Sequence, residues 1–485
     1  MAQWHYDRLS AQDNSFLLFE QGNVRMHVAS TNIFDVGPLA SPSGGIDIDL
    51  VKRATESILH LVPRYRQRLH KIPVFNHAVW VDDPHFDLDY HVRHTALPKP
   101  GSLLQLKTLV ARVMAQPLDR KRPLWETWII EGLEGGEQFA MITKIHHCMI
   151  DGASGVDLAN IQFSTSPEPT PLGPPKPFRP RPSPRRLELF LNETRRQAEV
   201  PVEIVKNFRR FATETEDLRE DLSMRANALS RLFGMGLRAD DTPLNGRVGP
   251  HRRFEWLSCR LDDLRSIRKG LGCSINDIVL TVVTGAVREY LLAKGVDVNV
   301  IDFKVSTPVS VRKEKASGEL GNDVSSWIIA LPISLSDPKQ QLEVIHTITE
   351  ELKVSNQAIG VQMMTQIQEW TPSTLLSLGA QSMSGPINTI VTNVPGPQIP
   401  LYFHGARLRA IYPAVPLMEG MGLGIALTSY AGTMGIGFNA DPDIIPDLDL
   451  FIRRFEQSLR EIAKAAGTPL GPISDDVNLV QATID

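Results

Sequence analysis

The chain has 485 residues, of which 42% are hydrophobic and 22% charged. This composition is typical of a globular protein, and the length exceeds what one hydrophobic core usually serves, so we expect two domains. Lysine and arginine number 51 against 55 aspartate and glutamate residues, which gives a formal net charge of −4. That balance excludes a strongly basic surface, and we expect no nucleic-acid partner.

The cysteines and the apolar runs indicate the compartment. Cys148, Cys259 and Cys273 are too few for a disulfide framework, which fits a reducing, intracellular environment. Residues 1–8 lack the apolar segment of a signal peptide, and no run approaches the ~20 apolar residues of a membrane span. We therefore expect a cytoplasmic protein that meets the inner face of the cell membrane, if at all, only at its surface.

Helical and strand patterns alternate at the start of the chain. Asp47 can cap a helix whose apolar residues keep helical spacing, and residues 102–116 show the same spacing. Apolar and polar residues alternate over 86–92, and β-prone residues fill 79–84 and 126–130. These three segments are predicted to be strands.

A proline-rich segment divides the chain. Nine prolines fall between residues 166 and 184, and a charged, helical pattern follows over residues 185–237. Such a segment is typical of a linker, with helices that either pack across the domains or lie on lipid. The predicted organisation is a first domain over 1–165, a linker over 166–250, a second domain over 251–470 and a tail over 471–485.

The second half of the chain again alternates helices and strands. Asn276 or Asp277 stands at a helix start, where its first expected role is to cap the helix, and Ala431-Gly432 marks the turn of a β-hairpin. The strands are predicted over 252–256, 303–310, 327–332, 387–394 and 423–439, and the helices over 261–270, 276–292, 338–358, 361–380 and 447–465.

One stretch carries candidate chemistry. The apolar run 138–143 predicts a buried strand, and His146 and His147 follow at its end. Asp151-Gly152 then forms a turn, where the aspartate can satisfy backbone amides and the glycine can take a conformation that other residues resist. Histidine is the side chain whose usual pKa suits proton transfer near neutral pH.

Other interpretations of this stretch are weaker. A histidine in a strand is often a core residue, and two could bind a metal. Adjacent residues of a strand point to opposite faces, so His146 and His147 cannot share one site unless the strand ends between them. No further ligand stands at a spacing typical of zinc, so we expect no metal site. The same alternation disfavours Cys148 as a nucleophile beside a histidine base.

The pattern His-His-x-x-x-Asp-Gly, filled by His146, His147, Asp151 and Gly152, resembles the active-site motif of the CoA-dependent acyltransferases. That superfamily includes chloramphenicol acetyltransferase and the condensation domains of peptide synthetases. Over nearly its whole length the chain resembles the bacterial wax ester synthase/diacylglycerol acyltransferase family. The supporting segments follow in family order: Pro123-Leu124-Trp125-Glu126, Asn276-Asp277, Pro308-Val309-Ser310-Val311-Arg312 and Asn393-Val394-Pro395-Gly396-Pro397.

The resemblance implies an α/β fold of two chloramphenicol-acetyltransferase-like domains, which form a pseudo-dimer with one active-site tunnel between them. It implies that His147 is the general base, that Asp151 orients the loop and that His146 is a packing or hydrogen-bonding neighbour. An arginine from residues 64–69 would pair with Asp151, although a solvated face is the usual role of such a basic run. The substrate-binding candidates are Pro123, Leu124, Trp125, Asn276, Asp277, Ser310, Arg312 and Asn393.

Some of these residues have a second interpretation. Trp125 is expected to be a packing residue first and to line the substrate site second, because aromatic side chains bury a large area. The donor that stabilises the oxyanion stays open between Asn276, Ser310 and a backbone amide.

The activity implied by the resemblance is transfer of an acyl group from acyl-CoA, as a co-substrate, to diacylglycerol or a long-chain fatty alcohol. The product would be triacylglycerol or a wax ester, with no bound cofactor. Two alternatives stay open: condensation or transesterification from a carrier-protein thioester, and a catalytically idle protein that binds lipid surfaces.

Overall fold

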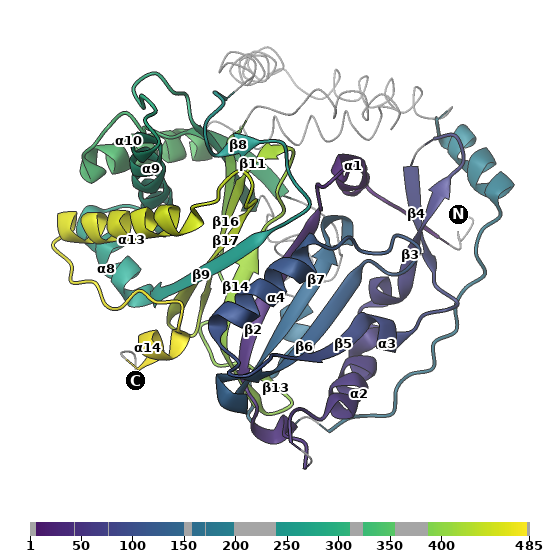
Figure 1. Cartoon of the computed structure of the whole chain (residues 1–485). Helices are drawn as coiled ribbons and strands as arrows, with labels where there is room; N and C mark the ends of the chain where they lie inside the picture. The colour runs from purple at the N-terminus through teal and green to yellow at the C-terminus, as the bar shows by residue number, and fades with distance from the viewer. Residues whose placement is uncertain are drawn as a thin grey trace.

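The structure is a computed structural model, and it describes residues 6–42, 44–75, 77–149, 158–169, 171–197, 239–310, 324–354 and 387–482. Within these residues the strands form two six-stranded mixed sheets, together with a three-stranded and a two-stranded sheet. Each large sheet carries its own helices, so the molecule has two α/β lobes (Figure 1). This confirms the expected fold class.

The sheet of the N-terminal lobe has the order β13-β14-β2-β7-β6-β5. The only parallel pair among these described strands is β5 with β6. Eight of the nine residues of β7 are buried, which confirms the strand expected before the two histidines. The strands of this sheet are β2 (His27–Asp35), β5 (Val92–Ala96), β6 (Trp125–Leu133), β7 (Gln138–His146), β13 (Tyr402–Phe403) and β14 (Ala406–Ala414).

Two helices of this lobe confirm the sequence analysis, which predicted a cap at Asp47 and a helix from residue 102. Asp47 Oδ1 accepts from the backbone N–H of Leu50, and Ser102 forms a capping box with Gln105. The helices are α1 (Ala11–Phe19), α2 (Ile48–Ile58), α3 (Leu88–His91) and α4 (Leu103–Ala115). A small sheet is formed by β1 (Asp7–Arg8), β3 (Gln67–Ile72) and β4 (His77–Asp82). The 3-10 turns are η1 (Gly37–Leu39), η2 (Leu59–Leu61), η3 (Pro63–Arg66), η4 (Glu134–Gly136) and η5 (His147–Met149).

The sheet of the C-terminal lobe has the order β11-β10-β12-β16-β17-β9. Its strands are β9 (Arg253–Arg260), β10 (Lys304–Ser310), β11 (Val324–Ala330), β12 (Thr389–Val394), β16 (Leu423–Tyr430) and β17 (Thr433–Ala440). The hairpin turns at Ala431 and Gly432, whose φ angles of 43° and 83° are the left-handed values that a two-residue turn requires. The two-stranded sheet pairs β8 (Asn245–Gly246) with β15 (Gly420–Met421).

The helices of the C-terminal lobe surround one long buried helix. They are α8 (Leu261–Leu271), α9 (Ile275–Ala293), α10 (Pro338–Val354), α13 (Leu448–Ala465) and α14 (Val477–Gln481). Figure 1 shows α9, α10 and α13 together on the outer side of this lobe. Most residues of α9 are buried, because it packs against α10, α13 and the sheet.

One strand crosses from the C-terminal half of the chain into the N-terminal sheet. β14 pairs antiparallel with β2, and it also packs on β16 and β17 of the other sheet. At the crossing Gly435 and Gly437 of β17 face the backbone carbonyls of Ile411 and Pro413, where a Cβ atom would overlap the oxygen. The two lobes therefore share a strand. The predicted boundaries after residues 165, 250 and 470 stay a prediction, and the sequence analysis did not foresee this crossing.

Helix α4 joins the lobes at a second place. Lys107, which is 7% exposed, ion-pairs with Glu255 of β9 at 2.9 Å and with Asp475 at 2.7 Å. Its ammonium also lies 5.0 Å from the centre of the Trp256 ring. Apolar residues of α4 and β9 share one core cluster, so this interface is largely apolar with a paired lysine inside it.

One predicted segment differs from the structure. The alternating residues 86–92 were expected to form a strand, but Asp87 accepts from the N–H of Asp89 and begins the single turn of α3, and β5 starts only at Val92. Helix α1, for which the sequence analysis gave no expectation, begins where Ser10 accepts from the N–H of Asp13. The helix predicted over 361–380 lies outside the described residues.

Candidate active site

The two histidines lie at the point where β7 ends. His146 is the last residue of β7, and His147 opens the 3-10 turn η5. The strand therefore ends between them, so strand alternation alone does not separate their roles. Asp151 and Gly152, which complete the motif, lie outside the described residues.

Neighbouring strands fix the backbone on both sides of the histidines. β2 pairs with β7 so that His27 lies opposite His146. The N–H of His147 donates to the carbonyl of Met26 at 2.8 Å, and the N–H of His146 donates to the carbonyl of Leu124 at 3.0 Å. The chain is thus held at both residues before it leaves the sheet.

His146 is fully buried, and both of its ring nitrogens have polar neighbours. The backbone N–H of Cys148 donates to His146 Nδ1 at 3.1 Å. Nδ1 is therefore the acceptor of the neutral ring, and Nε2 carries the hydrogen that it donates to Glu20 Oε2 at 3.2 Å. This environment agrees with the expectation of a packing and hydrogen-bonding neighbour.

His147 has a different environment. It is partly exposed, whereas His146 has an exposed fraction of 0%. Its ring stacks on the ring of Phe16 in α1, with 4.1 Å between centroids and 21° between planes. Of the two imidazoles, the one that the resemblance selects as the base is the one with access to solvent.

Glu20, at the C-terminal end of α1, is the centre of a polar cluster that sequence analysis missed. Its carboxylate accepts from Arg120 at 2.7 Å and from His146, and it lies 3.2 Å from His27 Nε2. The rings of His27 and His146 meet edge to face, with 5.7 Å between centroids. These residues come from α1, β2, β7 and the segment before β6, so no spacing in the sequence could have indicated the cluster.

The charge states follow from burial and from these neighbours. Burial raises the pKa of Glu20, but the imidazoles of His146 and His27 lower it by more, and the pKa stays well below its usual value. Burial lowers the pKa of His27 to about 4 and also lowers that of His146, against the opposing effect of Glu20. At neutral pH the cluster therefore contains an ionised carboxylate, a guanidinium and two neutral imidazoles.

A second buried charge lies on the same strand. Lys144 donates to the carbonyls of Val113 and Gln116, which end α4, and lies 3.3 Å from Glu126 of β6. Burial lowers the pKa of Lys144, and the carboxylate of Glu126 opposes this. Lys144 thus satisfies the last carbonyls of α4 and ties that helix to β7.

The segment Pro123-Leu124-Trp125 is buried next to the motif strand. The Trp125 ring stacks on Tyr65 at 4.4 Å and on His91 at 4.6 Å between centroids, and its indole N–H donates to the Tyr65 carbonyl. These contacts support the packing interpretation of Trp125. The role of the three residues in substrate binding stays a prediction.

The other candidates are spread over the C-terminal lobe. Asp277 belongs to the capping box of Ser274 at the start of α9, and it also accepts from Thr349 at 2.8 Å and contacts His346 Nδ1 at 2.9 Å. Asp277 therefore takes part in capping, but the N-cap residue is Ser274. Asn276 is the next residue toward the N-terminus of α9 and is partly exposed.

Three candidates remain from the strands of that lobe. Asn393 is partly exposed near the end of β12. Ser310 ends β10, and Arg312 lies outside the described residues. The roles of Asn276, Ser310 and Asn393 in substrate binding stay predictions.

The basic run over residues 64–69 includes one arginine that turns inward. Arg64 lies over the Trp80 ring at 4.8 Å and donates to Gln67 at 2.8 Å, whereas Arg66 lies over Phe178. Arg64 is also close enough to Cys148 to interact with it electrostatically. The expected pair with Asp151 lies outside the described residues.

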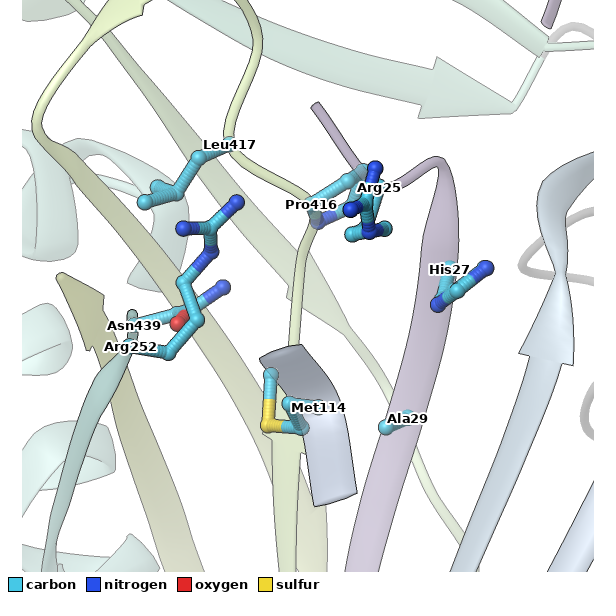
Figure 2. A pocket seen from close by; sticks show the side chains of 8 residues that line it. All are labelled: Arg25, His27, Ala29, Met114, Arg252, Pro416, Leu417 and Asn439. Carbon is cyan, nitrogen blue, oxygen red and sulfur yellow. The ribbon is translucent and has the colours of Figure 1, made fainter. Parts of the chain in front are cut away.

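A small cavity lies between the lobes beside the polar cluster. Figure 2 shows Arg25, His27 and Ala29 along one wall and Arg252, Leu417 and Asn439 facing them, with Met114 at the end of α4. Pro416 completes the lining. Since His27 also contacts Glu20, the cavity adjoins the cluster that holds His146. His147 does not line this cavity, and the active-site tunnel between the lobes that the resemblance implied stays a prediction.

The described ranges show no metal-binding cluster and no single helix that could span a membrane. No three or more histidine, cysteine, aspartate or glutamate side chains there are arranged to hold a metal ion. No single helix among those ranges is long and apolar enough to cross a membrane. The helices α8 and α9 are long and apolar enough only when taken together, and the chain bends by 96° between them.

Comparison with known sequences decides the family. The family model of the wax ester synthase/diacylglycerol acyltransferase catalytic domain matches residues 9–279, more than half of the chain. The chain belongs to this wax ester synthase/diacylglycerol acyltransferase family. The family's C-terminal domain model matches residues 320–463. The protein is therefore an acyltransferase enzyme, and the family expected from its motifs is confirmed.

Individual members of the family are similar over nearly their full length. O-acyltransferase WSD of Acinetobacter baylyi is 30% identical over 92% of this chain and 95% of its own. A Mycobacterium tuberculosis protein named as a probable diacylglycerol O-acyltransferase is 30% identical over 95% of this chain and 100% of its own.

Solved structures agree on the fold. The wax ester synthase/diacylglycerol acyltransferase from Marinobacter aquaeolei covers 95% of this chain and 100% of its own, with 25% identity and a TM-score of 0.64. The first condensation domain of the calcium-dependent antibiotic synthetase covers 97% of this chain and 98% of its own, with 15% identity and a TM-score of 0.60. The condensation domain supports the two-lobed fold alone.

Proposed function

We propose that this acyltransferase moves the acyl group of an acyl-CoA to the hydroxyl of diacylglycerol or of a long-chain fatty alcohol. The observation that supports this most directly is the placement of His147, a partly exposed imidazole held at the end of a buried strand inside the family's catalytic domain. The names of its relatives supply the two acceptor classes.

The proposed reaction needs one base. The neutral imidazole of His147 takes the proton of the acceptor hydroxyl while that oxygen attacks the thioester carbonyl carbon. The carbonyl electron pair moves to its oxygen and forms a tetrahedral oxyanion. When the oxyanion collapses, the C–S bond breaks and the imidazolium returns the proton to the CoA thiolate. The products are an ester and free CoA, with no acyl-enzyme.

Other residues assist in this proposal. Asp151 would orient the loop behind His147, and Gly152 would allow its turn. A donor from Asn276, Ser310 or a backbone amide would stabilise the oxyanion. Because both the donor and the acceptors are lipids or carry lipid chains, the enzyme would act while bound peripherally to a membrane or a lipid body.

A labelled-substrate assay tests the proposal. Purified protein is offered radiolabelled palmitoyl-CoA with diacylglycerol in one reaction and hexadecanol in another, and the lipids are separated by thin-layer chromatography. Labelled triacylglycerol or wax ester is the expected product. Ester formed only from an acylated carrier protein, and none from palmitoyl-CoA, would replace the proposal with the carrier-dependent alternative. No ester from either donor would contradict both.

A further inference from the structure

Helix α1 contacts both histidines of the motif through two residues that lie one turn apart. Phe16 stacks on the ring of His147, and Glu20 accepts from the ring of His146. Residues four positions apart lie on the same side of a helix. A single rigid element therefore touches the fully buried histidine and the partly exposed one, on the two sides of the point where β7 ends.

The contact with Glu20 determines which nitrogen of His146 carries the hydrogen. A neutral imidazole has one N–H and one acceptor nitrogen. With Nε2–H donated to Glu20, Nδ1 is free to accept the N–H of Cys148, the residue that follows His147. The opposite tautomer would place a hydrogen against that N–H. The Glu20 carboxylate thus stabilises the first turn after the strand through the ring of His146.

The position of Glu20 is electrostatically costly. A negative charge at the C-terminal end of a helix opposes the helix dipole, and burial removes its hydration. Arg120 offsets this cost, because it donates to the Glu20 carboxylate and also to the carbonyls of Leu17 and Glu20 at the end of α1. An apolar residue at position 20 would need no such compensation, so packing alone does not account for the carboxylate.

We propose that Phe16 and Glu20 of α1 are positioning residues for the reactive histidine. Glu20 fixes the tautomer of His146, which holds the turn that carries His147, and Phe16 fixes the plane of the His147 ring. The proposal rests on the proposed function, because it takes His147 to be the base. Neither residue touches the substrate in this account, so both act on the rate of the chemical step through His147.

The first experiment compares Glu20→Gln with Glu168→Gln, an exposed glutamate in the proline-rich segment. Arg120 and His146 both donate to Oε2 of Glu20. With its amide oxygen at that place, glutamine lacks the negative charge that pairs with Arg120 and puts an NH2 group beside His27. Because a misplacement of about 1 Å can cost ~100-fold in rate, we expect kcat of Glu20→Gln to fall roughly 10–100-fold. The KM for palmitoyl-CoA should change less than about threefold, since substrate contacts stay. Glu168→Gln should match the wild type.

Nitrogen NMR of the full chain, with its histidines isotopically labelled, measures the tautomer of His146. A substitution that only destabilised the fold would not change this tautomer. The ring nitrogens of His146, assigned by their absence in His146→Gln, should show the Nε2–H tautomer in the wild type. In Glu20→Gln that tautomer should lose its predominance. An unchanged tautomer, or a loss of activity that appears only in KM, overturns the role of Glu20.

Phe16 supplies an independent pair of variants. Phe16→Leu removes the stacked ring and should lower kcat roughly tenfold or more, whereas Phe16→Tyr keeps the ring and should retain most of the wild-type kcat. If Glu20→Gln does not fold, this pair decides the proposal. Equal kcat for Leu and Tyr at this position, with both variants folded, contradicts it.

Failure of the proposed function can be told from failure of the positioning role. If the wild type forms no ester from palmitoyl-CoA with either acceptor, the acyl-CoA reaction is wrong. The tautomer of His146 in the wild type and in Glu20→Gln is measured without substrate, and it still supports or contradicts the link from Glu20 to the turn.

Discussion

His146 and His147 are neighbours in the chain with different surroundings. His146 is enclosed by Glu20, His27 and the N–H of Cys148, whereas His147 is partly exposed and stacks on Phe16. The difference comes from the end of β7 between them, after which the chain turns into η5. Their substitutions should therefore have different effects.

His147→Ala should lower kcat by about 10²–10⁴-fold, the usual effect of losing a general base, with little change in melting temperature or in acyl-CoA affinity. His146→Ala removes a buried, hydrogen-bonded ring, so the melting temperature should fall. Its loss of turnover should be smaller than that of His147→Ala. Steady-state kinetics and thermal melting of both variants check this. A folded but inactive His146→Ala beside a nearly normal His147→Ala would reverse the two roles.

Buried histidines should also set the acid stability of the fold. Burial lowers the pKa of His91 to about 4 and that of His77 to about 4, from 6.5. The unfolded chain therefore binds these protons first, so stability is complete above pH 6.5 and decreases as the pH falls toward 4. Each histidine contributes roughly 3 kcal/mol at most to this decrease.

The variant His91→Phe tests this dependence. The His91 ring stacks on Trp125 and Phe86, so a phenyl ring fits the same stack, although the hydrogen bond to the Trp125 carbonyl is lost. We expect a lower melting temperature at pH 7 and a smaller further fall between pH 7 and pH 4.5 than in the wild type. The exposed His85→Gln serves as control. An unchanged pH dependence in His91→Phe would show that other groups cause the acid sensitivity.

At the scale of elements, the site depends on how strands and helices end. β7 ends at His146, and α1 ends at Phe19 with Glu20 as its C-cap. Helix ends have unpaired carbonyls, which Arg120 satisfies at α1 and Lys144 at α4, whereas the N–H of Cys148 after β7 donates to His146 of that strand. The ends of three elements therefore meet around the motif.

The close packing of β14 on β17 is a second place where the fold depends on how two elements meet. Because a Cβ atom at Gly437 would overlap the carbonyl of Pro413, the strands can approach only with glycine at this position. We expect Gly437→Ala to destabilise the protein by about 2 kcal/mol or more, seen as a lower melting temperature. Gly173→Ala, where no atom lies within 4 Å, is the control. A wild-type melting temperature for Gly437→Ala would mean that the strands can separate at low cost.

At the scale of the whole molecule, the lobes are joined by the shared strand β14 and by α4, whose Lys107 pairs with Glu255 and Asp475. The cavity beside His27 is lined by Met114 of α4 and by Pro416 and Leu417, which follow β14, so elements of both connections contribute to it. That the active site lies between the lobes stays a prediction.

Membrane contact is predicted to be peripheral, because the proposed substrates are lipids and they are reached from the surface. In cell fractionation we expect the protein to divide between supernatant and membrane or lipid-body fractions, and salt or detergent should release the bound part. The control is a known integral protein in the same fractions. Resistance to carbonate extraction, as that control shows, would contradict a peripheral mode.

Sequence alone determined the features that depend on neighbours along the chain. The cap at Asp47, the helix over 102–116, the hairpin turn at Ala431-Gly432 and the buried strand before the histidines all agree with the structure. In each case the deciding interaction spans only a few residues, so the local pattern contains it. The family could also be predicted from the sequence, because its motif segments follow one another in order along the chain.

Tertiary structure decided the features that depend on distant partners. Glu20 and His146 are 126 positions apart, and only the packing of α1 against η5 brings them together. Residues 86–92 alternate like a strand, yet the Asp87 cap and the start of β5 at Val92 make them a helical turn followed by an edge strand. β14 belongs to the N-terminal sheet because its backbone pairs antiparallel with β2. Hydrogen bonding and burial decide which distant segments pair with one another. The order of residues in a single sequence does not show which segments will meet.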